Sequence, residues 1–324
     1  MSAGSRVSSR SGRARAAAAL VVVALVGCSG RGAEPAFREL VISTGNPGGV
    51  YEVYGAALAE QLGAEQGRAA TARQSDGSVE NVLRVSNGEA DAGFALADVT
   101  AAAAAGEAPF PAVLEVCALA RLYDNYVQVV TLADSGIEGL AGLRGKVVAV
   151  GSLGSGTAFV ADRVLAAVDL LPGRDLDVVH LDVADASAAL AAGTIAGMLW
   201  SGGLPTASIT RLADEHGVRL LDLTPAVPAL LGAHGAAYRP STIPTSAYGA
   251  ARPVPTLSVP NYLVVRCDLP DDDVRALLDL LFDPSGGVRN AHPEAGRLNR
   301  RSAIATGGTP LHPAAVQWFR DQAR

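Results

Sequence analysis

The stretch Glu39–Leu62, ELVISTGNPGGVYEVYGAALAEQL, joins a short apolar run, a glycine-rich turn and an amphipathic helix pattern. Residues 40–42 are typical of a buried strand, and the apolar residues of 50–62 recur at helical spacing. A strand–turn–helix unit of this kind presents backbone N–H groups at the positive end of the helix, where an anion can bind. The same pattern is equally typical of a tight connection that binds no ligand.

A second unit of the same kind lies in the middle of the chain. The apolar run 147–150 leads into the turn 151–157, GSLGSGT, and a helix pattern follows. The turn is not a nucleotide-binding loop, because Gly156 stands where a phosphate loop has lysine, and its glycines do not follow the dinucleotide-binding spacing. The hydroxyls of Ser155 and Thr157 and the nearby N–H groups can instead hold a carboxylate.

The first 27 residues have the pattern of a secretion signal. Several arginines precede the apolar run 16–26, which is too short to span a bilayer as an ordinary membrane helix. The run ends in LVGC, which resembles a bacterial lipobox, so we expect cleavage before Cys28, a lipid on its thiol and a tether over 28–36. This predicts a lipid-anchored protein on the extracytoplasmic face of the cell membrane. An ordinary secretion signal with an incidental cysteine is the alternative.

The charge of the chain argues against a nucleic-acid partner. The full chain carries a net charge of −6, and removal of residues 1–27 takes away four arginines and no acidic residue. No basic stripe is left that could neutralise phosphates. No stretch after the signal is long and apolar enough to cross a membrane.

Two cysteines, Cys117 and Cys267, follow the lipidation site. They can form a disulfide outside the cytoplasm, or they can be two separate small buried residues, which is the interpretation that we favour because the sequence gives no distance between them. The five histidines are scattered, and no CxxC motif or histidine–cysteine cluster is present. We therefore expect no metal and no cofactor.

From residue 37 onward the chain alternates strand and helix patterns, which predicts an α/β fold with a parallel sheet covered by helices. We expect strands at 40–42, 92–96, 113–119, 127–132, 147–150, 178–181, 195–200, 218–223 and 256–266. We expect helices at 50–62, 78–85 (capped by Ser78), 160–171, 186–191, 205–213, 271–281 and 313–322, with Val316 and Phe319 facing inward in the last.

Two extended runs break the simple alternation and suggest two lobes. The run 125–131 follows a strand with almost no helix between them, and 256–266, TLSVPNYLVVR, is long enough to pass between lobes. We therefore expect lobe one to comprise 37–127 and 257–324, and lobe two to comprise 128–256. Two successive α/β domains without a return of the chain are the alternative.

The chain resembles the TAXI-type solute-binding receptors of tripartite ATP-independent periplasmic (TRAP) transporters, from about Leu40 to Phe319. The segments that carry the resemblance are, in order, STGNPGGVYEVYGAALAEQL, DGSVENVLRVSNGEADAGFALAD, LYDNYVQVV, LRGKVVAVGSLGSGT, AGMLWSGGLPTASI, VPNYLVVRCDLPDDDV and TPLHPAAVQWF. The resemblance implies a type II periplasmic-binding-protein-like fold, with two α/β lobes and crossover strands around a ligand cleft. It also implies capture of a small carboxylate, such as glutamate, a related acidic amino acid or a dicarboxylate, for a TRAP-type membrane permease.

The resemblance further implies which residues bind the ligand. They are Gly49, Val50 and Tyr51 in the first turn, Ser78, Asp98 facing a ligand ammonium, Tyr123, the carboxylate-holding turn Gly154, Ser155, Gly156 and Thr157, and finally Trp200 and Gly202. Each has a structural alternative: the tyrosines can be core residues, Asp98 can cap a helix that begins at Val99, and Trp200 can pack inside lobe two. This sequence departs from many family members at Val50, where a hydroxyl is usual, and at 96–97, where a polar pair is usual.

We expect a monomer without enzymatic activity. The alternatives are an enzyme on a similar fold, such as a hydrolase, and a receptor for a sensor kinase or another transporter. The chain contains neither a GxSxG nor an HExxH motif.

Overall fold

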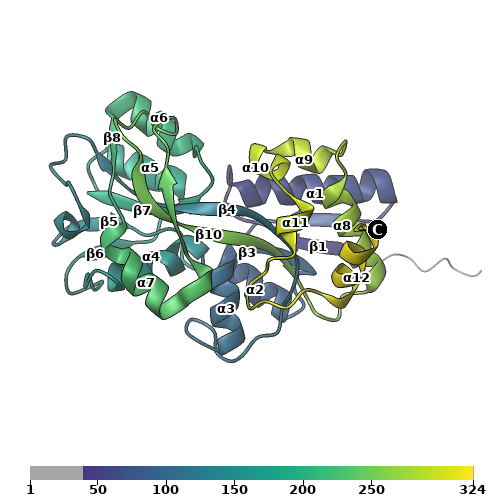
Figure 1. Cartoon of the computed structure of the whole chain (residues 1–324). Helices are drawn as coiled ribbons and strands as arrows, with labels where there is room; N and C mark the ends of the chain where they lie inside the picture. The colour runs from purple at the N-terminus through teal and green to yellow at the C-terminus, as the bar shows by residue number, and fades with distance from the viewer. Residues whose placement is uncertain (1–38, 324) are drawn as a thin grey trace, which may run out of the picture. The chain divides into compact units, whose positions relative to one another are not determined.

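The computed structural model describes residues 39–323, which lie within a single compact unit, Phe37–Arg324 (Figure 1). The predicted secretion signal, the lipidation site Cys28 and the tether lie outside the described residues. Within the described range, none of the helices has both the length and the apolar character needed to span a membrane.

The elements alternate along the chain much as the sequence predicts. The strands are β1 Leu40–Ser43, β2 Ala70–Arg73, β3 Ala92–Leu96, β4 Cys117–Leu132, β5 Val147–Ala149, β6 Asp177–Val179, β7 Gly197–Gly202, β8 Val218–Leu220, β9 Arg239–Ile243 and β10 Val254–Val265. The α-helices are α1 Val50–Gln66, α2 Ser78–Ser86, α3 Ala97–Ala105, α4 Gly156–Ala166, α5 Val183–Ala191, α6 Ala207–His216, α7 Val227–His234, α8 Asp271–Phe282, α9 Gly287–Ala291, α10 Pro293–Gly296, α11 Arg300–Ala303 and α12 Pro313–Asp321.

The strands form one mixed sheet in the order β2-β1-β3-β10-β4-β7-β5-β6, with β8 on β4 and β9 on β10. The strands at the two ends pair in parallel, as expected: β1 with β2 and β3, and β5 with β6 and β7. The prediction of a wholly parallel sheet is wrong, however, because β10 runs antiparallel to β3 and β4, and β4 runs antiparallel to β7. Figure 1 shows β4 and β10 running together through the middle of the sheet.

The long strand β4 also corrects the prediction of two strands at 113–119 and 127–132. It is one strand of 16 residues, and the polar residues Asp124 and Asn125 lie inside it. Aspartate and asparagine are depleted in strands, so the sequence reads as a break at this point. Here both are paired with β10, Asp124 with Pro260 and Asn125 with Val259, and this pairing keeps the strand continuous.

Two local predictions about helices need correction. Ser78 does not cap α2, because the capping position is Gly77, while the Ser78 hydroxyl accepts a 3.1 Å hydrogen bond from the N–H of Leu96. In α12 the buried residues are Ala314, Ala315 and Trp318, and Val316 is only half-buried, whereas the half-buried Phe319 packs against the core as predicted. The aromatic packing of Trp318 against Phe282, with ring centroids 5.1 Å apart, decides which face of α12 turns inward.

Cys117 and Cys267 form a disulfide with a Cα–Cα distance of 5.0 Å, so the preference for two separate cysteines is wrong. The register of the sheet explains the pairing. Cys117 is the partner of Val265 across the β4–β10 ladder, and Cys267 lies two residues beyond it.

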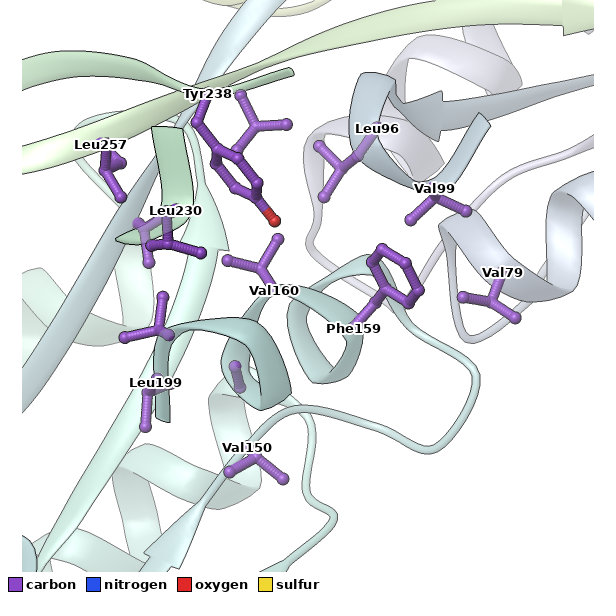
Figure 2. Packing of buried hydrophobic residues seen from close by; sticks show 14 of the residues in the cluster. Val79, Leu96, Val99, Val150, Phe159, Val160, Leu199, Leu230, Tyr238 and Leu257 are labelled. Atoms are coloured by element: carbon purple, nitrogen blue, oxygen red, sulfur yellow. The ribbon is translucent and has the colours of Figure 1, made fainter. Parts of the chain in front are cut away.

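The largest hydrophobic cluster extends across the predicted lobe boundary. It contains Val79, Leu96 and Val99 from predicted lobe one together with Phe159 and Val160 from predicted lobe two. Figure 2 shows Phe159 and Val160 on α4 beside these three residues. The start of α4 is therefore held against α2 and α3 by burial of apolar surface.

Candidate functional site

In the first glycine turn, two backbone N–H groups already donate hydrogen bonds to groups of the same segment. The N–H of Gly48 donates to the carboxylate of Glu52 at 3.0 Å, and the N–H of Gly49 donates to the carbonyl of Asn46 at 3.1 Å. Gly49 is the capping residue of α1, so Val50 and Tyr51 are the first residues of that helix. Their N–H groups have no acceptor within the helix and remain the donors that this turn offers.

The second glycine turn faces the start of α2. The carbonyl of Gly154, a residue with φ of +85°, accepts hydrogen bonds from the N–H groups of Val79 and Glu80, both at 3.1 Å. The hydroxyl of Ser155 accepts from the N–H of Ala158 at 3.0 Å and so caps α4. The turn thus supplies a carbonyl to one helix and a hydroxyl to the other.

The beginnings of α2 and α4 lie too close for a side chain between them. A Cβ atom added to Gly156 would lie 2.6 Å from the hydroxyl of Ser78 and 2.6 Å from Cδ1 of Leu96. The two glycine turns also approach each other directly, since the Ser152 hydroxyl lies 3.5 Å from Oδ1 of Asn46. The structure therefore brings the two predicted turns together.

Polar side chains from the central strands join this junction. The hydroxyl of Tyr51 donates to Oδ1 of Asn261 on β10 and lies 3.4 Å from the hydroxyl of Ser78. Nδ2 of Asn261 donates to the carbonyl of Tyr123 at 3.3 Å. This links the first helix to the middle of the sheet.

A second set of contacts runs from β4 to the start of α4. Nδ2 of Asn125 donates to the carbonyl of Ser201 on β7 at 3.1 Å, and the N–H of Ser201 donates to the hydroxyl of Thr157 at 3.2 Å. Thr157 follows Gly156, which lies against Ser78, so the two sets of contacts close on each other. We call this arrangement the polar ring, and its members are Tyr51, Ser78, Asn125, Thr157, Ser201 and Asn261.

The polar ring is made of uncharged, hydrogen-bonding side chains. Burial raises the pKa of Tyr51 well above its usual value, so its phenol stays protonated. One acceptor of the ring is unsatisfied among the described residues: Oδ1 of Asn125 is buried and has no hydrogen-bond partner. Buried polar atoms without a partner are rare in folded proteins. The other three among the described residues, the Tyr54 hydroxyl, Nε2 of Gln128 and Nε of Arg219, lie outside the polar ring.

Asp98, predicted to face a ligand ammonium, accepts hydrogen bonds from two protein groups. It is fully buried in the first turn of α3, and its carboxylate accepts from the Tyr238 hydroxyl at 2.6 Å and from the Val99 N–H at 2.9 Å. The guanidinium of Arg163 lies 3.8 Å away. Burial raises the pKa of Asp98, and Tyr238 and Arg163 act in the opposite direction.

Trp200 and Gly202 lie beside the polar ring without joining it. The indole N–H of Trp200 donates to the hydroxyl of Thr206 at 3.1 Å, and a Cβ on Gly202 would overlap the indole nitrogen. Trp200 packs against the buried cluster that includes Met198 and Ile209. These contacts fit the alternative in which Trp200 packs inside predicted lobe two. The residue of this segment that belongs to the polar ring is Ser201, which lies between Trp200 and Gly202.

Of the predicted ligand residues, Tyr51, Ser78 and Thr157 belong to the ring. Tyr123 contributes its carbonyl, and its buried phenol has a pKa raised well above the usual value by desolvation. Asn125, Ser201 and Asn261 are ring residues that were not predicted from the sequence. A usable signal was present for Asn261, because it precedes the apolar run 262–265 with a side chain that strands disfavour, whereas Asn125 lies beside other polar residues of β4.

One pocket of the described residues lies away from the polar ring. A pocket of about 370 Å³ between α4 and α7 is lined by Arg163, Leu230 and His234, among others, and includes no ring residue. Among residues 39–323, no group of three or more histidine, cysteine, aspartate or glutamate side chains is arranged to hold a metal ion.

Comparison with known proteins identifies both a family and a fold. A family model described as the NMT1-like family matches residues 42–322. Similar solved structures include a protein of Bordetella bronchiseptica RB50, 16% identical, covering 87% of this chain and 88% of that chain with a TM-score of 0.51. A structure described as a periplasmic transporter is 15% identical and covers 89% and 93% with a TM-score of 0.51. The aliphatic sulphonate-binding protein SsuA of Escherichia coli is 15% identical and covers 88% and 83%, with a TM-score of 0.47.

Similarity at these identities establishes the fold alone. The chain has the α/β, periplasmic-binding-protein-like fold that the resemblance implies, and its sheet is mixed.

Proposed function

The chain belongs to the NMT1-like family, and from this premise we propose that it is an extracytoplasmic solute-binding protein of a transport system. The observation that carries this proposal is the polar ring. It lies where two glycine turns meet, it is uncharged, and one of its buried acceptors is free to receive a ligand. A site of this composition is suited to holding a small polar molecule reversibly.

The proposal includes the two predicted lobes, 37–127 with 257–324 and 128–256. With these boundaries, Thr157 and Ser201 come from lobe two and the other four ring residues come from lobe one. A ligand in the ring would contact both lobes, so binding would favour the arrangement in which they are together.

The proposed ligand is a small carboxylate, and the proposed receptor type is the TAXI type of a TRAP transporter. The first turns of α1 and α4 favour an anionic ligand, since helix N-termini present N–H groups and a positive electrostatic field. Gly49 to Tyr51 and Gly154 to Thr157 are the segments that would supply these donors. The TRAP-type permease partner rests on the ordered segments quoted above.

One feature of the described residues supports the proposed location outside the cytoplasm. The Cys117–Cys267 disulfide is a bond that persists mainly in oxidising compartments. The proposal adds a lipid on Cys28 as the membrane anchor.

We propose binding without catalysis. The six ring residues include hydroxyls and amides, but none of them is a carboxylate, an imidazole or a thiol that could act as a general base at neutral pH. A hydroxyl nucleophile needs such a neighbour for activation.

The test begins with the chain purified without dialysis, followed by native mass spectrometry of any bound molecule. Thermal unfolding is then measured with increasing concentrations of glutamate, 2-hydroxyglutarate and glutarate. A ligand at about one hundred times its Kd stabilises the folded state by about 2.7 kcal/mol, and the ligand is recovered unchanged.

A matched variant locates the binding site. Tyr51→Phe removes the hydroxyl that bonds Asn261, and it should weaken binding, whereas Tyr248→Phe removes a buried hydroxyl bonded to Gln128 outside the ring and should not. Equal loss in both variants would contradict the ring as the site. Conversion of the ligand to a product would contradict binding without catalysis.

A further inference from the structure

The orientation of the Asn125 side chain is fixed by a backbone carbonyl. The carbonyl of Ser201 can only accept a hydrogen bond, so the group 3.1 Å from it must be the NH2 of Asn125 and not its oxygen. The oxygen Oδ1 therefore points to the other side of the amide. No donor among the described residues reaches it, although Asn125 is only 6% exposed.

A neighbouring asparagine, Asn261, has hydrogen-bond partners for both its amide oxygen and its NH2 group. Asn261 lies on the adjacent strand β10, two residues beyond Val259, which is the cross-strand partner of Asn125. The Oδ1 of Asn261 accepts from the Tyr51 hydroxyl, and its Nδ2 donates to the carbonyl of Tyr123. Asn125 has the equivalent donor contact but lacks the acceptor contact.

An acceptor left unpaired in a buried site costs free energy, and a ligand that supplies the missing donor recovers it. Asn125 is also connected to the start of α4, because its partner Ser201 donates to the Thr157 hydroxyl at 3.2 Å. Asn125 and the first turn of α4 are therefore joined through Ser201 by two hydrogen bonds.

We propose that Asn125 is a specificity-determining residue that accepts a hydrogen bond from an N–H or O–H group next to the ligand carboxylate. This inference rests on the proposed function and on the same site. The proposed function does not separate two classes of ligand. One class has an ammonium or hydroxyl group beside the carboxylate, and the other consists of plain dicarboxylates without such a group. Asn125 would favour the first.

The test compares three probes of similar length by calorimetry: glutamate, 2-hydroxyglutarate and glutarate. The wild-type protein should bind at least one of the first two about tenfold or more tightly than glutarate, which is the effect of one buried hydrogen bond. In Asn125→Leu this ratio should fall to within about twofold, while the affinity for glutarate is largely kept.

The matched control is Gln128→Leu. Gln128 is a second buried amide on β4, and its Oε1 accepts from the Tyr248 hydroxyl at 2.7 Å, outside the polar ring. This change should leave the ratio as in the wild type. Asn125→Asp adds a negative charge at the same position, so it should raise the preference for glutamate over 2-hydroxyglutarate, and it provides a second readout if Asn125→Leu does not fold.

The outcomes separate this inference from the proposed function. Wild-type protein that binds glutarate as tightly as glutamate and 2-hydroxyglutarate, or variants of Asn125 that fold and keep the wild-type ratios, would overturn the role of Asn125 and leave solute binding intact. Equal weakening of all three probes in Asn125→Leu would also overturn it, because that result indicates a purely structural role. Binding of none of the probes by the wild-type protein would contradict the carboxylate ligand itself, and the inference would fail with it.

Discussion

The carbonyl oxygen of Gly154 accepts a 3.1 Å hydrogen bond from the backbone N–H of Val79. The first N–H groups of a helix have no acceptor inside the helix, and here a turn from a distant part of the chain supplies one for α2. The contact requires a backbone with φ of +85° at Gly154 and no side chain at Gly156. The predicted anion-binding turn thus also holds the two helix starts together.

The first prediction concerns Gly156→Ala. The added methyl group would lie 2.6 Å from the Ser78 hydroxyl, which is itself fixed by the N–H of Leu96, so the helix starts must separate or the hydroxyl must move. We expect a loss of about 1–3 kcal/mol in the free energy of unfolding, measured by urea denaturation. Gly232→Ala is the control, since Gly232 lies within α7 with no atom within 4 Å of an added Cβ. Equal effects of the two changes would contradict the close contact.

The second prediction separates capping from ligand binding at Ser155. Ser155→Ala removes the acceptor for the N–H of Ala158 and should lower the free energy of unfolding by about 1 kcal/mol. Ser155→Asn should restore stability, because asparagine is an equally good capping residue. If Ser155 also contacts the ligand, calorimetry should show that Ser155→Asn restores stability without restoring affinity. Stability that does not respond to either change would rule out the capping role.

The third prediction concerns the disulfide between Cys117 and Cys267, which are 150 positions apart in the chain. The bond restricts the unfolded chain, so reduction should lower the free energy of unfolding by about 2–5 kcal/mol. Thermal unfolding with and without dithiothreitol measures the effect. The variant Cys117→Ala/Cys267→Ala should unfold at the temperature of the reduced protein and should not respond to the reagent. Free thiols detected by mass spectrometry in untreated protein would contradict the bond.

The fourth prediction uses the buried pair of Tyr238 and Asp98. Burial raises the pKa of Asp98 in the folded protein, so the folded state binds this proton more tightly than the unfolded state does. The stabilisation linked to this proton is complete below the ordinary carboxyl pKa and is lost as the pH rises through the raised value. The Tyr238 hydroxyl opposes the shift by bonding the charged form.

Tyr238→Phe should therefore raise the pKa of Asp98 further and destabilise the protein more at about pH 7.5 than at about pH 4. The expected loss near neutral pH is about 1–3 kcal/mol, measured by urea denaturation at both values. Tyr248→Phe is the control, because the Tyr248 hydroxyl donates to the uncharged Gln128 and its loss should have the same cost at both pH values. A pH-independent cost for Tyr238→Phe would show that Asp98 is not charged in the folded protein.

Local patterns in the sequence were sufficient to predict the two strand–turn–helix units that meet at the candidate site. The apolar run and glycine turn before α1, and the second copy before α4, depend on residues that are close in the chain, so periodicity and turn chemistry reveal them. The same evidence indicated an α/β fold. Turn chemistry placed Thr157 among the candidates for the site, and the resemblance to the TAXI-type receptors added Tyr51 and Ser78.

Contacts between distant segments decided the rest. The antiparallel pairing of β4 with β10 brought Cys117 next to Cys267 and Asn125 next to the site, and no local pattern specifies that register. Contacts of the same long-range kind bring Tyr238 and Arg163 to Asp98. The sequence alone determined the two strand–turn–helix units that lead into α1 and α4, because apolar spacing and turn glycines are local features. Only the tertiary structure determined which polar groups of the polar ring are satisfied, and that Oδ1 of Asn125 is among the buried atoms left without a partner in the described part of the chain, because that depends on neighbours far away in the sequence.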